Sequence, residues 1–537
     1  MDPQKIGEYE LSETPLAEDA FGKLYVGNHS QSGEVVYIRL SRTPRAALLE
    51  KPLYGGLIFA SEEISDTSGY YQVAPAPEGE LLQWMWPDLR SRGLLGCYLI
   101  LNIVLETARA IEQLHKQWLI HGQINPAAIL VRPGYPVQAY VLCMQPFQQQ
   151  RPYDLLKAID YLEYIPQEQL RGAGEPSTDI FTLGMLLYNS FSANPPYAAQ
   201  EPRQMAEAIL WGDLEPFRFQ FETLSEDLLA ELAADVETLG MVIAKATSRN
   251  PRERYATMQE LTQILAQLVR RFDPVEVGAR LAMQGKYQQA IDALGNPADH
   301  PDPARAFLLL GQLYGFGLNE PDKGIIAFRK ALNYKPDLET AILGRAHLYA
   351  QQKRFKLAKH EVMTLIEREP ANLGYMLAYA EILVQAGETE PALNVLYRIQ
   401  SENPFYLPAY QMGIQIRIDQ NELRQAEIEC NRALDVVSRV VRTGNLDPLQ
   451  VAELYYQRAV IHRMSKRNER AVVWLNKALE QAPDHAASHS MLADLYNEMG
   501  QPELGLQHLV ESLGLAENVD KILQKLEQLF KSRPDNE

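Results

Sequence analysis

The sequence contains little cysteine. Its 537 residues include three, Cys97, Cys143 and Cys430, and these stand far apart. A count this low argues against a disulfide framework, and no two of them have a metal-ligand spacing, so we predict no metal site. The N-terminal stretch "MDPQKIGEYELSE" also lacks the apolar run that a signal peptide needs. We therefore expect a cytoplasmic protein.

The sequence also lacks an excess of basic residues. It has 51 Lys and Arg against 69 Asp and Glu, which gives a formal net charge of -18. Because such acidity repels nucleic-acid phosphates and anionic lipid head groups, neither nucleic acid nor a membrane is an expected partner. The most apolar stretch, residues 94–105, is shorter than a membrane span and lies within a helical pattern.

Two halves of the chain differ in pattern. A chain of 537 residues is too long for one hydrophobic core, so we expect at least two domains. Residues 1–80 contain short alternating runs separated by turn signals, which is typical of strands. From about residue 94 the spacing of apolar residues becomes helical. The pattern predicts a small strand-rich lobe followed by a helical one.

The second half repeats itself. Pro336, Pro370 and Pro404 stand 34 residues apart, each after an amphipathic helical pattern, and Pro448 and Pro483 continue the series. A period of 34 residues with two helices per unit is typical of tetratricopeptide repeats. Small residues recur where two helices of a unit approach closely: Ala346, Ala380, Gly413, Ala459 and Ala493. We predict a repeat domain over residues 273–535, with about seven helix pairs and a closing helix "VDKILQKLEQLFKS".

Five blocks of the first half occur in a characteristic order. They are "YELSETPLAEDAFGKLYVGNHSQSGEVVYIRL", "HGQINPAAILV", "EYIPQEQLRG", "STDIFTLGMLLYNSFSANPPY" and "ATSRNPRERYATMQELTQIL". In order and spacing they resemble the eukaryotic-type Ser/Thr protein kinases, a family that also occurs in bacteria. The resemblance covers residues 9–265 and implies an α+β bilobal kinase-like domain over residues 1–270, ahead of the all-α repeat superhelix. The stretch between the first block and residue 94 matches least, and the family's regulatory helix is not placed there.

The residues that maintain the shape of that family are present. The resemblance assigns His121 to the catalytic-loop histidine and Asp179 to the aspartate that holds this loop from below. It assigns Glu168 and Arg254 to a buried ion pair of the large lobe. Gly184 lets the central helix pack closely. Each of these residues has a structural role and none a chemical one.

The residues that transfer phosphate in the family are replaced. The reaction needs a carboxylate base, oxygen ligands for Mg²⁺ and a cation on the phosphates. The base position holds Gln123, whose amide cannot accept a proton near neutral pH, and the lysine position after it holds Asn125. The two magnesium-ligand positions hold Ala128, which offers no ligand, and Cys143, whose thiol is a poor ligand for a hard ion.

The nucleotide cleft is degenerate as well. Arg39 stands at the phosphate-anchoring lysine position and keeps the charge without the compact geometry. Above the phosphates, Ala17 and Asp19 replace glycines, so that Gly22 alone remains. The resemblance therefore implies a pseudokinase without a cofactor. Metal-free ATP binding stays open as an alternative, because the family's adenine pocket is apolar; Asp19 and the lost ligands oppose it.

The repeats predict a second kind of site. Stacked helix pairs form a superhelix whose concave face is lined by the first helix of each unit. By register this face shows Leu343, His347, Leu377, Glu381, Tyr410, Ile414, Tyr456 and Val460. These positions lack the Lys/Asn/Arg clamp of repeats that bind chaperone tails, and they suit an extended peptide or an amphipathic helix of a partner protein. The alternative is that some of them pack against neighbouring repeats.

The sequence thus favours a bacterial pseudokinase–repeat scaffold that assembles a signalling complex. The two-residue Asp-Pro break before the repeats indicates rigid packing of the domains. An atypical active kinase would need Glu168, Asp179, Asp154 or Asp160 to substitute for the lost groups. A nucleotide-sensing switch would bind ATP without turnover. The state of the cleft, open or filled, distinguishes these hypotheses.

Overall fold

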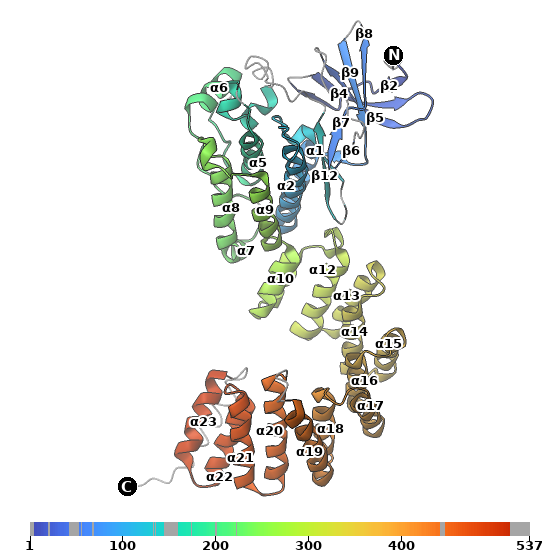
Figure 1. Ribbon diagram of the computed structural model, residues 1–537, viewed down its shortest axis with the longest axis vertical. Coiled ribbons are helices and arrows are strands. Elements are labelled where there is room, and N and C mark those ends of the chain that lie inside the picture. The colour runs from blue at the N-terminus through green and yellow to red at the C-terminus, as the bar shows by residue number, and fades with distance from the viewer. Residues whose placement is uncertain are drawn as a thin grey trace. The chain divides into compact units, whose positions relative to one another are not determined.

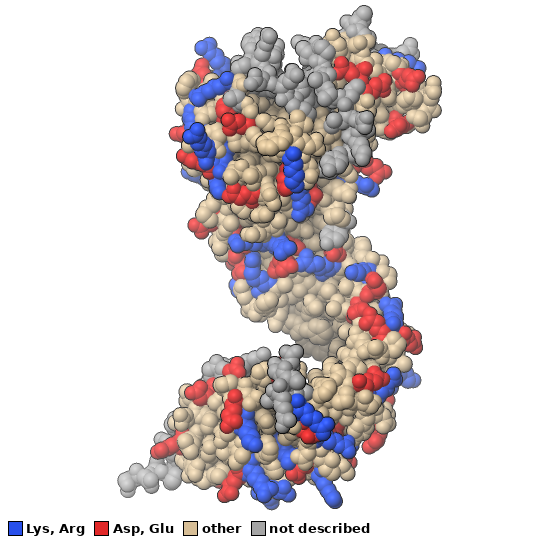
Figure 2. All heavy atoms as spheres, viewed as in Figure 1, with Lys and Arg blue, Asp and Glu red and all other residues tan. Residues whose placement is uncertain are grey.

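The computed structural model (Figure 1) describes residues 5–19, 22–41, 53–54, 56–66, 69–132, 134, 136–143, 159–172, 174–198, 201–221, 223–440 and 446–515. The chain forms two compact units, Met1–Asp337 and Leu338–Glu537. The first unit contains the strands and the helices up to residue 334, and the second consists of helices. On the face seen in Figure 2, acidic and basic side chains alternate over the surface of each unit.

The strands of the first unit form two sheets. They are β1 (Lys5–Ile6), β2 (Tyr9–Leu11), β3 (Ala17–Asp19), β4 (Gly22–His29), β5 (Val35–Ser41), β6 (Leu53–Tyr54), β7 (Leu57–Phe59), β8 (Glu62–Asp66), β9 (Gly69–Pro75), β10 (Glu80–Leu81), β11 (Ile129–Arg132) and β12 (Gln138–Cys143). One sheet has the order β1-β2-β4-β5-β9-β8, with β3 also paired to β4, and all its pairs are antiparallel. The other has the order β10-β11-β12-β7-β6, in which β12 and β7 are parallel.

Strand β5 shows how the sequence builds the first sheet. Its "VVYIRLS" alternates, so that Val36 and Ile38 point to one face and Tyr37 and Arg39 to the other. Val36 and Ile38 belong to an apolar cluster with Ile6, Leu11, Tyr71 and Val73. Tyr37 belongs to a second cluster on the opposite face. The sheet is therefore packed on both sides.

The helices of the first unit surround a continuous core. They are α1 (Leu82–Ser91), α2 (Gly93–His115), η1 (Pro126–Ala128), η2 (Ile159–Tyr164), α4 (Gln167–Leu170), α5 (Pro176–Phe191), α6 (Pro202–Trp211), α7 (Glu226–Glu231), α8 (Ala233–Ala246), η3 (Pro251–Glu253), α9 (Met258–Arg271), α10 (Pro274–Met283), α11 (Tyr287–Leu294), η4 (Pro297–Asp299), α12 (Pro303–Gln312), η5 (Leu313–Gly317) and α13 (Pro321–Tyr334). Gly184 lies where α5 meets α8: a Cβ there would stand 2.8 Å from that of Ala246, which agrees with the close packing expected of it.

Helix α2 is longer than its most apolar stretch suggested. With 23 residues, the helix is long and apolar enough to cross a membrane by length and composition alone, whereas the apolar stretch 94–105 by itself is too short. However, 78% of its most apolar window is buried within the protein. Its buried residues, from Leu94 to Leu114, belong to the main apolar cluster of the unit. The helix is thus packed as the core helix of a folded domain.

The repeats begin inside the first unit. Asp273 stands between α9 and α10, and its carboxylate accepts a hydrogen bond from the Val275 backbone N–H at 2.8 Å. The same carboxylate pairs with Arg305 at 2.6 Å and lies 3.3 Å from His300 Nε2. His300 in turn stacks on Tyr98 of α2, with ring centroids 5.4 Å apart. These contacts, and a core shared by α2, α9, α10 and α12, pack the first repeat helices directly against the kinase-like helices, and the rigidity that the short Asp-Pro break indicated stays a prediction.

The second unit consists of five further helix pairs. They are α14 (Glu339–Gln351) with α15 (Phe355–Arg368), α16 (Leu373–Gln385) with α17 (Thr389–Glu402), α18 (Leu407–Asp419) with α19 (Leu423–Val440), α20 (Pro448–Met464) with α21 (Asn468–Gln481), and α22 (Ala486–Glu498) with α23 (Pro502–Leu515). With α10/α11 and α12/α13, the described residues contain the seven pairs that the period predicted. The predicted closing helix lies outside the described residues. One detail of the prediction was wrong: Pro448 begins α20, after its N-cap Asp447, and does not end a helix.

The turn within each pair has a fixed backbone geometry. The second residue after the end of the first helix is left-handed, with positive φ, at Gly285, Asn319, Lys353, Gly387, Asn421, Lys466 and Gly500. The first five follow one another at intervals of 34 residues, as do the last two. At Lys353 the turn is closed by hydrogen bonds of 2.8 Å from its own N–H to Ala350 O and from the Arg354 N–H to Tyr349 O. Because a side chain is strained in this conformation, glycine suits the position best.

We therefore expect Lys353→Gly to stabilise the second unit. The φ of Lys353 is 60°, and relief of this strain is worth at most about 1 kcal/mol after the added chain entropy of glycine. Urea denaturation measures the change. Gly387→Ala, at the equivalent turn, is the matched control and should lower stability by a similar amount. A stabilised Gly387→Ala variant would contradict this account of the turns.

Candidate functional site

The segment 121–128 forms a loop that Asp179 holds in place. Asp179 lies in the first turn of α5 and is fully buried. Its Oδ2 accepts a hydrogen bond from the His121 backbone N–H at 2.9 Å, and its Oδ1 accepts one from the Gly122 backbone N–H at 2.7 Å. His115 Nε2 lies 2.8 Å from the same carboxylate. Gly122 has a φ of 70°, so the loop needs glycine at the point where the carboxylate grips it.

His121 connects this loop to the second sheet. Its Nδ1 accepts a hydrogen bond from the Gln123 backbone N–H at 3.2 Å, and its Nε2 donates to Leu142 O of β12 at 3.1 Å. This pattern requires the neutral imidazole with its proton on Nε2. Burial lowers the pKa of His121, which agrees with a neutral ring. The histidine therefore fixes the loop against the strand.

Gln123 is buried in this loop without a hydrogen-bond partner for its amide. It is 7% exposed, and neither its Oε1 nor its Nε2 has a partner among the described residues. Asn125, by contrast, caps η1: its Oδ1 accepts from the Ala127 N–H at 2.9 Å and its Nδ2 donates to Gln123 O at 3.2 Å. Ala128 is buried at the end of η1. The loop thus presents one unpaired amide and no carboxylate.

We expect Gln123→Leu to stabilise the first unit by about 1 kcal/mol, because it replaces an unpaired buried amide with an apolar group of similar volume. Chemical denaturation measures the change. Gln123→Glu is the matched control and should destabilise, because it buries a charge without a partner. If Gln123→Leu destabilised the unit by more than about 1 kcal/mol, the amide would have a hydrogen-bond partner outside the described residues.

Cys143 ends β12, next to Phe59 of β7 in the second sheet. It is 5% exposed, and burial together with the charge of Asp179 raises the pKa of its thiol well above the ordinary value. A protonated, buried thiol is a packing group, and it has neither the charge nor the oxygen atoms that Mg²⁺ prefers. Among the described residues, no cluster of three or more His, Cys, Asp and Glu side chains could hold a metal ion.

The space between the two sheets is filled by apolar side chains. Tyr37 of β5 belongs to a buried cluster with Leu24 of β4, Ala74 of β9, Leu81 of β10, and Leu130 and Leu142 of the second sheet. Tyr37 is 5% exposed, and burial raises the pKa of its hydroxyl. Ala17 packs against the edge of the same cluster. The sequence analysis named Ala17, Asp19 and Arg39 as the residues that could fill the cleft. It did not identify Tyr37, which lies in the cluster between the sheets.

Arg39 lies on the same face of β5 as Tyr37. It is 5% exposed, and its charge is close enough to His121 to lower the pKa of that imidazole further. Its cross-strand neighbours are Leu24 and Gln72. Asp19 and Gly22 pair through their backbones at the start of the hairpin, and the side chain of Asp19 lies outside the described residues. The same holds for the side chain of Asp160 and for the whole of Asp154.

The predicted ion pair of the large lobe is present. Arg254 donates from Nη1 to Glu168 Oε1 at 2.6 Å and from Nη2 to Glu168 Oε2 at 3.2 Å. Its Nε donates to Ser248 O at 2.7 Å, and its guanidinium lies over the Phe181 ring, 4.8 Å from the centroid. The geometry is bidentate and fully buried on the arginine side, so Glu168 has no spare role as a base.

The first helices of the second unit form its inner layer, since α14, α16, α18 and α20 each contact the next. Leu343, His347, Leu377 and Glu381 are half-buried there, and His347 Nε2 lies 3.5 Å from Glu381 Oε2. Tyr456 and Val460 are half-buried on α20. These six remain candidates for the groove.

The prediction was wrong for Tyr410 and Ile414. They are 6% and 0% exposed and lie in an apolar cluster between α18, α19 and α20. The error comes from aligning Gly413 with Ala380, a step of 33 residues. Helices α14, α16 and α18 begin at Glu339, Leu373 and Leu407, a strict interval of 34. In this register the groove positions of α18 are Gln411 and Gln415, which are half-buried and exposed.

Comparisons with known proteins agree with this geometry in both units. The N-terminal region is homologous to bacterial Ser/Thr protein kinases. It is similar to Ser/Thr-protein kinase PknB of Mycobacterium tuberculosis, with 24% identity over 200 residues, 36% of this chain and 30% of the relative. It is also similar to PknB of Mycobacterium leprae, with 25% identity over 164 residues, 30% of this chain and 25% of the relative.

A further match extends over more of the chain. Ser/Thr-protein kinase PknD of Chlamydia felis is 22% identical over 293 residues, 49% of this chain and 30% of the relative. The chain thus spans less than a third of the length of the kinases it matches. In the C-terminal region, the tetratricopeptide repeat model matches residues 304–338 and 452–485. The chain therefore combines a kinase-like region with tetratricopeptide repeats, which generally mediate protein–protein interaction.

Proposed function

We propose that the chain is a catalytically inactive pseudokinase–tetratricopeptide scaffold of the cytoplasm, which holds partner proteins in a regulatory complex. The observation that carries this proposal is the filled cleft. The resemblance places a nucleotide between β4/β5 and the loop 121–128, and Tyr37 occupies that space in a buried apolar cluster. The adenine base of a nucleotide would have to displace the packed ring of Tyr37. The free-energy cost of this displacement is about that of a large-to-small core substitution.

The catalytic positions add support from chemistry. Phosphoryl transfer needs a proton acceptor and oxygen ligands for Mg²⁺. Gln123 offers a neutral amide, Ala128 a methyl group and Cys143 a protonated thiol, and all three are buried. Asp179 and Glu168, which an atypical kinase would need as substitutes, already bind the loop and Arg254. What remains of the catalytic loop is its shape.

A nucleotide titration tests the inactive cleft. Because a ligand of the native state raises the melting temperature by mass action, we expect no rise with about 1 mM ATP, with or without Mg²⁺ or Mn²⁺. A metal-dependent rise would contradict the proposal and support an atypical kinase. A metal-independent rise would favour the second candidate, a nucleotide-sensing switch. The observation on which that candidate rests is Arg39, a buried cation beside the cleft.

The scaffold role depends on the inner face of the second unit. Half-buried Leu377 and Tyr456 present apolar surface beside polar groups such as Glu381, a mixture that suits a peptide or a partner helix. We expect Leu377→Glu with Tyr456→Glu to abolish co-purification of partner proteins from the native host. Leu357→Glu is the matched control, because Leu357 is 41% exposed on α15, a second helix. Equal loss in both variants would count against the groove.

A further inference from the structure

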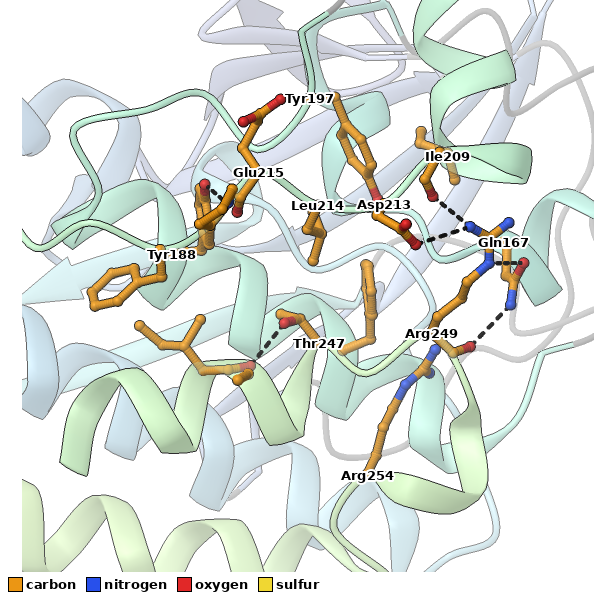
Figure 3. Close-up of a pocket in the computed structure, with 16 residues that line it drawn as sticks. Gln167, Tyr188, Tyr197, Ile209, Asp213, Leu214, Glu215, Thr247, Arg249 and Arg254 are labelled. Carbon is orange, nitrogen blue, oxygen red and sulfur yellow. Dashed lines mark hydrogen bonds and ion pairs between the residues drawn. The ribbon is translucent and has the colours of Figure 1, made fainter. Parts of the chain in front are cut away.

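The large lobe of the first unit contains a cavity away from the filled cleft (Figure 3). Its volume is about 300 Å³, and it lies between α5, α6, α8 and the segment 212–217. Aromatic rings form much of its wall: Phe181 and Tyr188 from α5, Tyr197 from the turn after α5, and Phe217. A cavity of this size is at the lower end of small-molecule sites, which span about 300–1,000 Å³. We refer to it as the large-lobe cavity.

Fixed hydrogen bonds keep the cavity open. Arg249 donates to the carbonyl oxygens of Leu210 and Gly212, and its Nε donates to Gln167 Oε1 at 3.2 Å. On the other side, Tyr188 Oη donates to Glu215 O at 2.9 Å, and the Glu215 N–H donates to Pro196 O at 2.9 Å. In Figure 3 these bonds hold the segment that carries Asp213, Leu214 and Glu215 at the rim. The cavity cannot close without breaking them, so it is preformed.

The two arginines that line the cavity are already paired. The guanidinium of Arg249 is taken up by two carbonyls, by Gln167 and by Asp213 at 3.6 Å. Arg254 is taken up by Glu168 and two backbone carbonyls. An anionic ligand would therefore lose its hydration without gaining a cation of its own, and the carboxylate of Glu215 at the rim is exposed to water. The site suits an uncharged ligand.

One hydroxyl in the wall has no hydrogen-bond partner among the residues that the structure describes. Tyr197 is 6% exposed, and its hydroxyl makes no hydrogen bond to any described residue. Figure 3 shows its ring pointing toward the hollow. Burial raises the pKa of this hydroxyl, so it remains protonated and able to donate. A protonated hydroxyl in the wall of an open cavity can donate to a ligand that supplies an acceptor, in place of water.

We propose that the large-lobe cavity binds an uncharged aromatic small molecule that carries a hydrogen-bond acceptor, and that Tyr197 donates to this acceptor. The rings of Phe181, Tyr188 and Phe217 supply the contact surface for one or two fused rings. The site would give the kinase-like region a ligand without use of the filled cleft. It does not depend on the pseudokinase proposal, since it involves none of the catalytic-loop residues.

Acetophenone is the probe in a titration of the full chain, and saturation-transfer NMR detects its binding. It has an aromatic ring and one carbonyl acceptor. We expect binding with a Kd below about 1 mM, as suits a ligand of this size. Ethylbenzene lacks the acceptor and should bind at least about fivefold more weakly, and benzoate, which is charged, should not bind.

Three variants locate the probe. Tyr197→Phe removes the donor alone and should weaken acetophenone at least about fivefold without changing ethylbenzene. Ala244→Trp places a ring in the cavity from an exposed position of α8 and should abolish binding of both. Ala233→Trp, exposed on the same helix but outside the cavity, is the matched control. No binding to the unaltered chain, binding that survives Ala244→Trp, or equal affinity in Tyr197→Phe would overturn the proposal.

Discussion

A fragment that ends at residue 270 is expected not to fold, whereas one that ends at residue 337 folds. The change of pattern from kinase-like to repeat sequence occurs at residues 270–273, but the apolar core crosses it. Phe272, Val277, Leu281 and Leu294 are at most 1% exposed and belong to the same cluster as α2 and α9. Full burial of one such side chain contributes about 1.5–3 kcal/mol, and a domain has a net stability of about 5–15 kcal/mol.

Circular dichroism and thermal denaturation of three fragments measure this effect. Residues 1–337 should unfold cooperatively, and residues 1–270 should lack a cooperative transition or lose more than about 5 kcal/mol. The fragment 338–537 serves as the control for an independent repeat unit. A fragment 1–270 as stable as 1–337 would show that the joint of Asp273, His300, Arg305 and Tyr98 contributes little.

Asp179→Ala is expected to destabilise the first unit by about 3–5 kcal/mol, although no catalysis depends on it in the proposed function. The substitution leaves the backbone N–H groups of His121 and Gly122 without an acceptor in a buried loop, and it frees His115. The unit spans Met1–Asp337, and at an unfolding entropy of about 2.1 cal/mol/K per residue the melting temperature should fall by about 4–7 °C. Differential scanning calorimetry of the full chain resolves this transition.

Asp227→Ala is the matched control for this substitution. Asp227 is exposed in the first turn of α7, so its removal should change stability by no more than about 0.5 kcal/mol. An Asp179→Ala chain as stable as this control would mean that the carboxylate does not hold the loop, and the structural role assigned to it would be wrong.

Much of the fold could be predicted because its signals are local and periodic. The 34-residue interval predicted seven helix pairs, and the left-handed turn residues repeat at the same interval. The order of five blocks predicted the kinase-like region, with the loop at His121 and the ion pair of Glu168 and Arg254. These residues are bound to backbone groups or to each other at fixed sequence positions, which is why a motif identifies them.

The rest depends on contacts that no motif records. In the sequence, Tyr37 cannot be distinguished from an ordinary strand residue. Its place in the cleft follows only from the register of β5 with its neighbouring strands and from its cluster with Leu130 and Leu142. The groove positions of α18 were misplaced by one residue because Gly413 was taken as the close-packing position. The large-lobe cavity is lined by residues from Gln167 to Arg254, which only the folded chain brings together.

The most direct test of the central claim is a phosphoryl-transfer measurement. The full chain is incubated with γ-labelled ATP, Mg²⁺ or Mn²⁺ and a general protein substrate, and incorporated phosphate is counted against a heat-denatured sample. We expect no incorporation above that background, because Gln123, Ala128 and Cys143 supply neither base nor metal ligand and Tyr37 fills the cleft. Incorporation that requires the metal and is lost in Asp179→Ala would contradict the account and make the chain an active kinase.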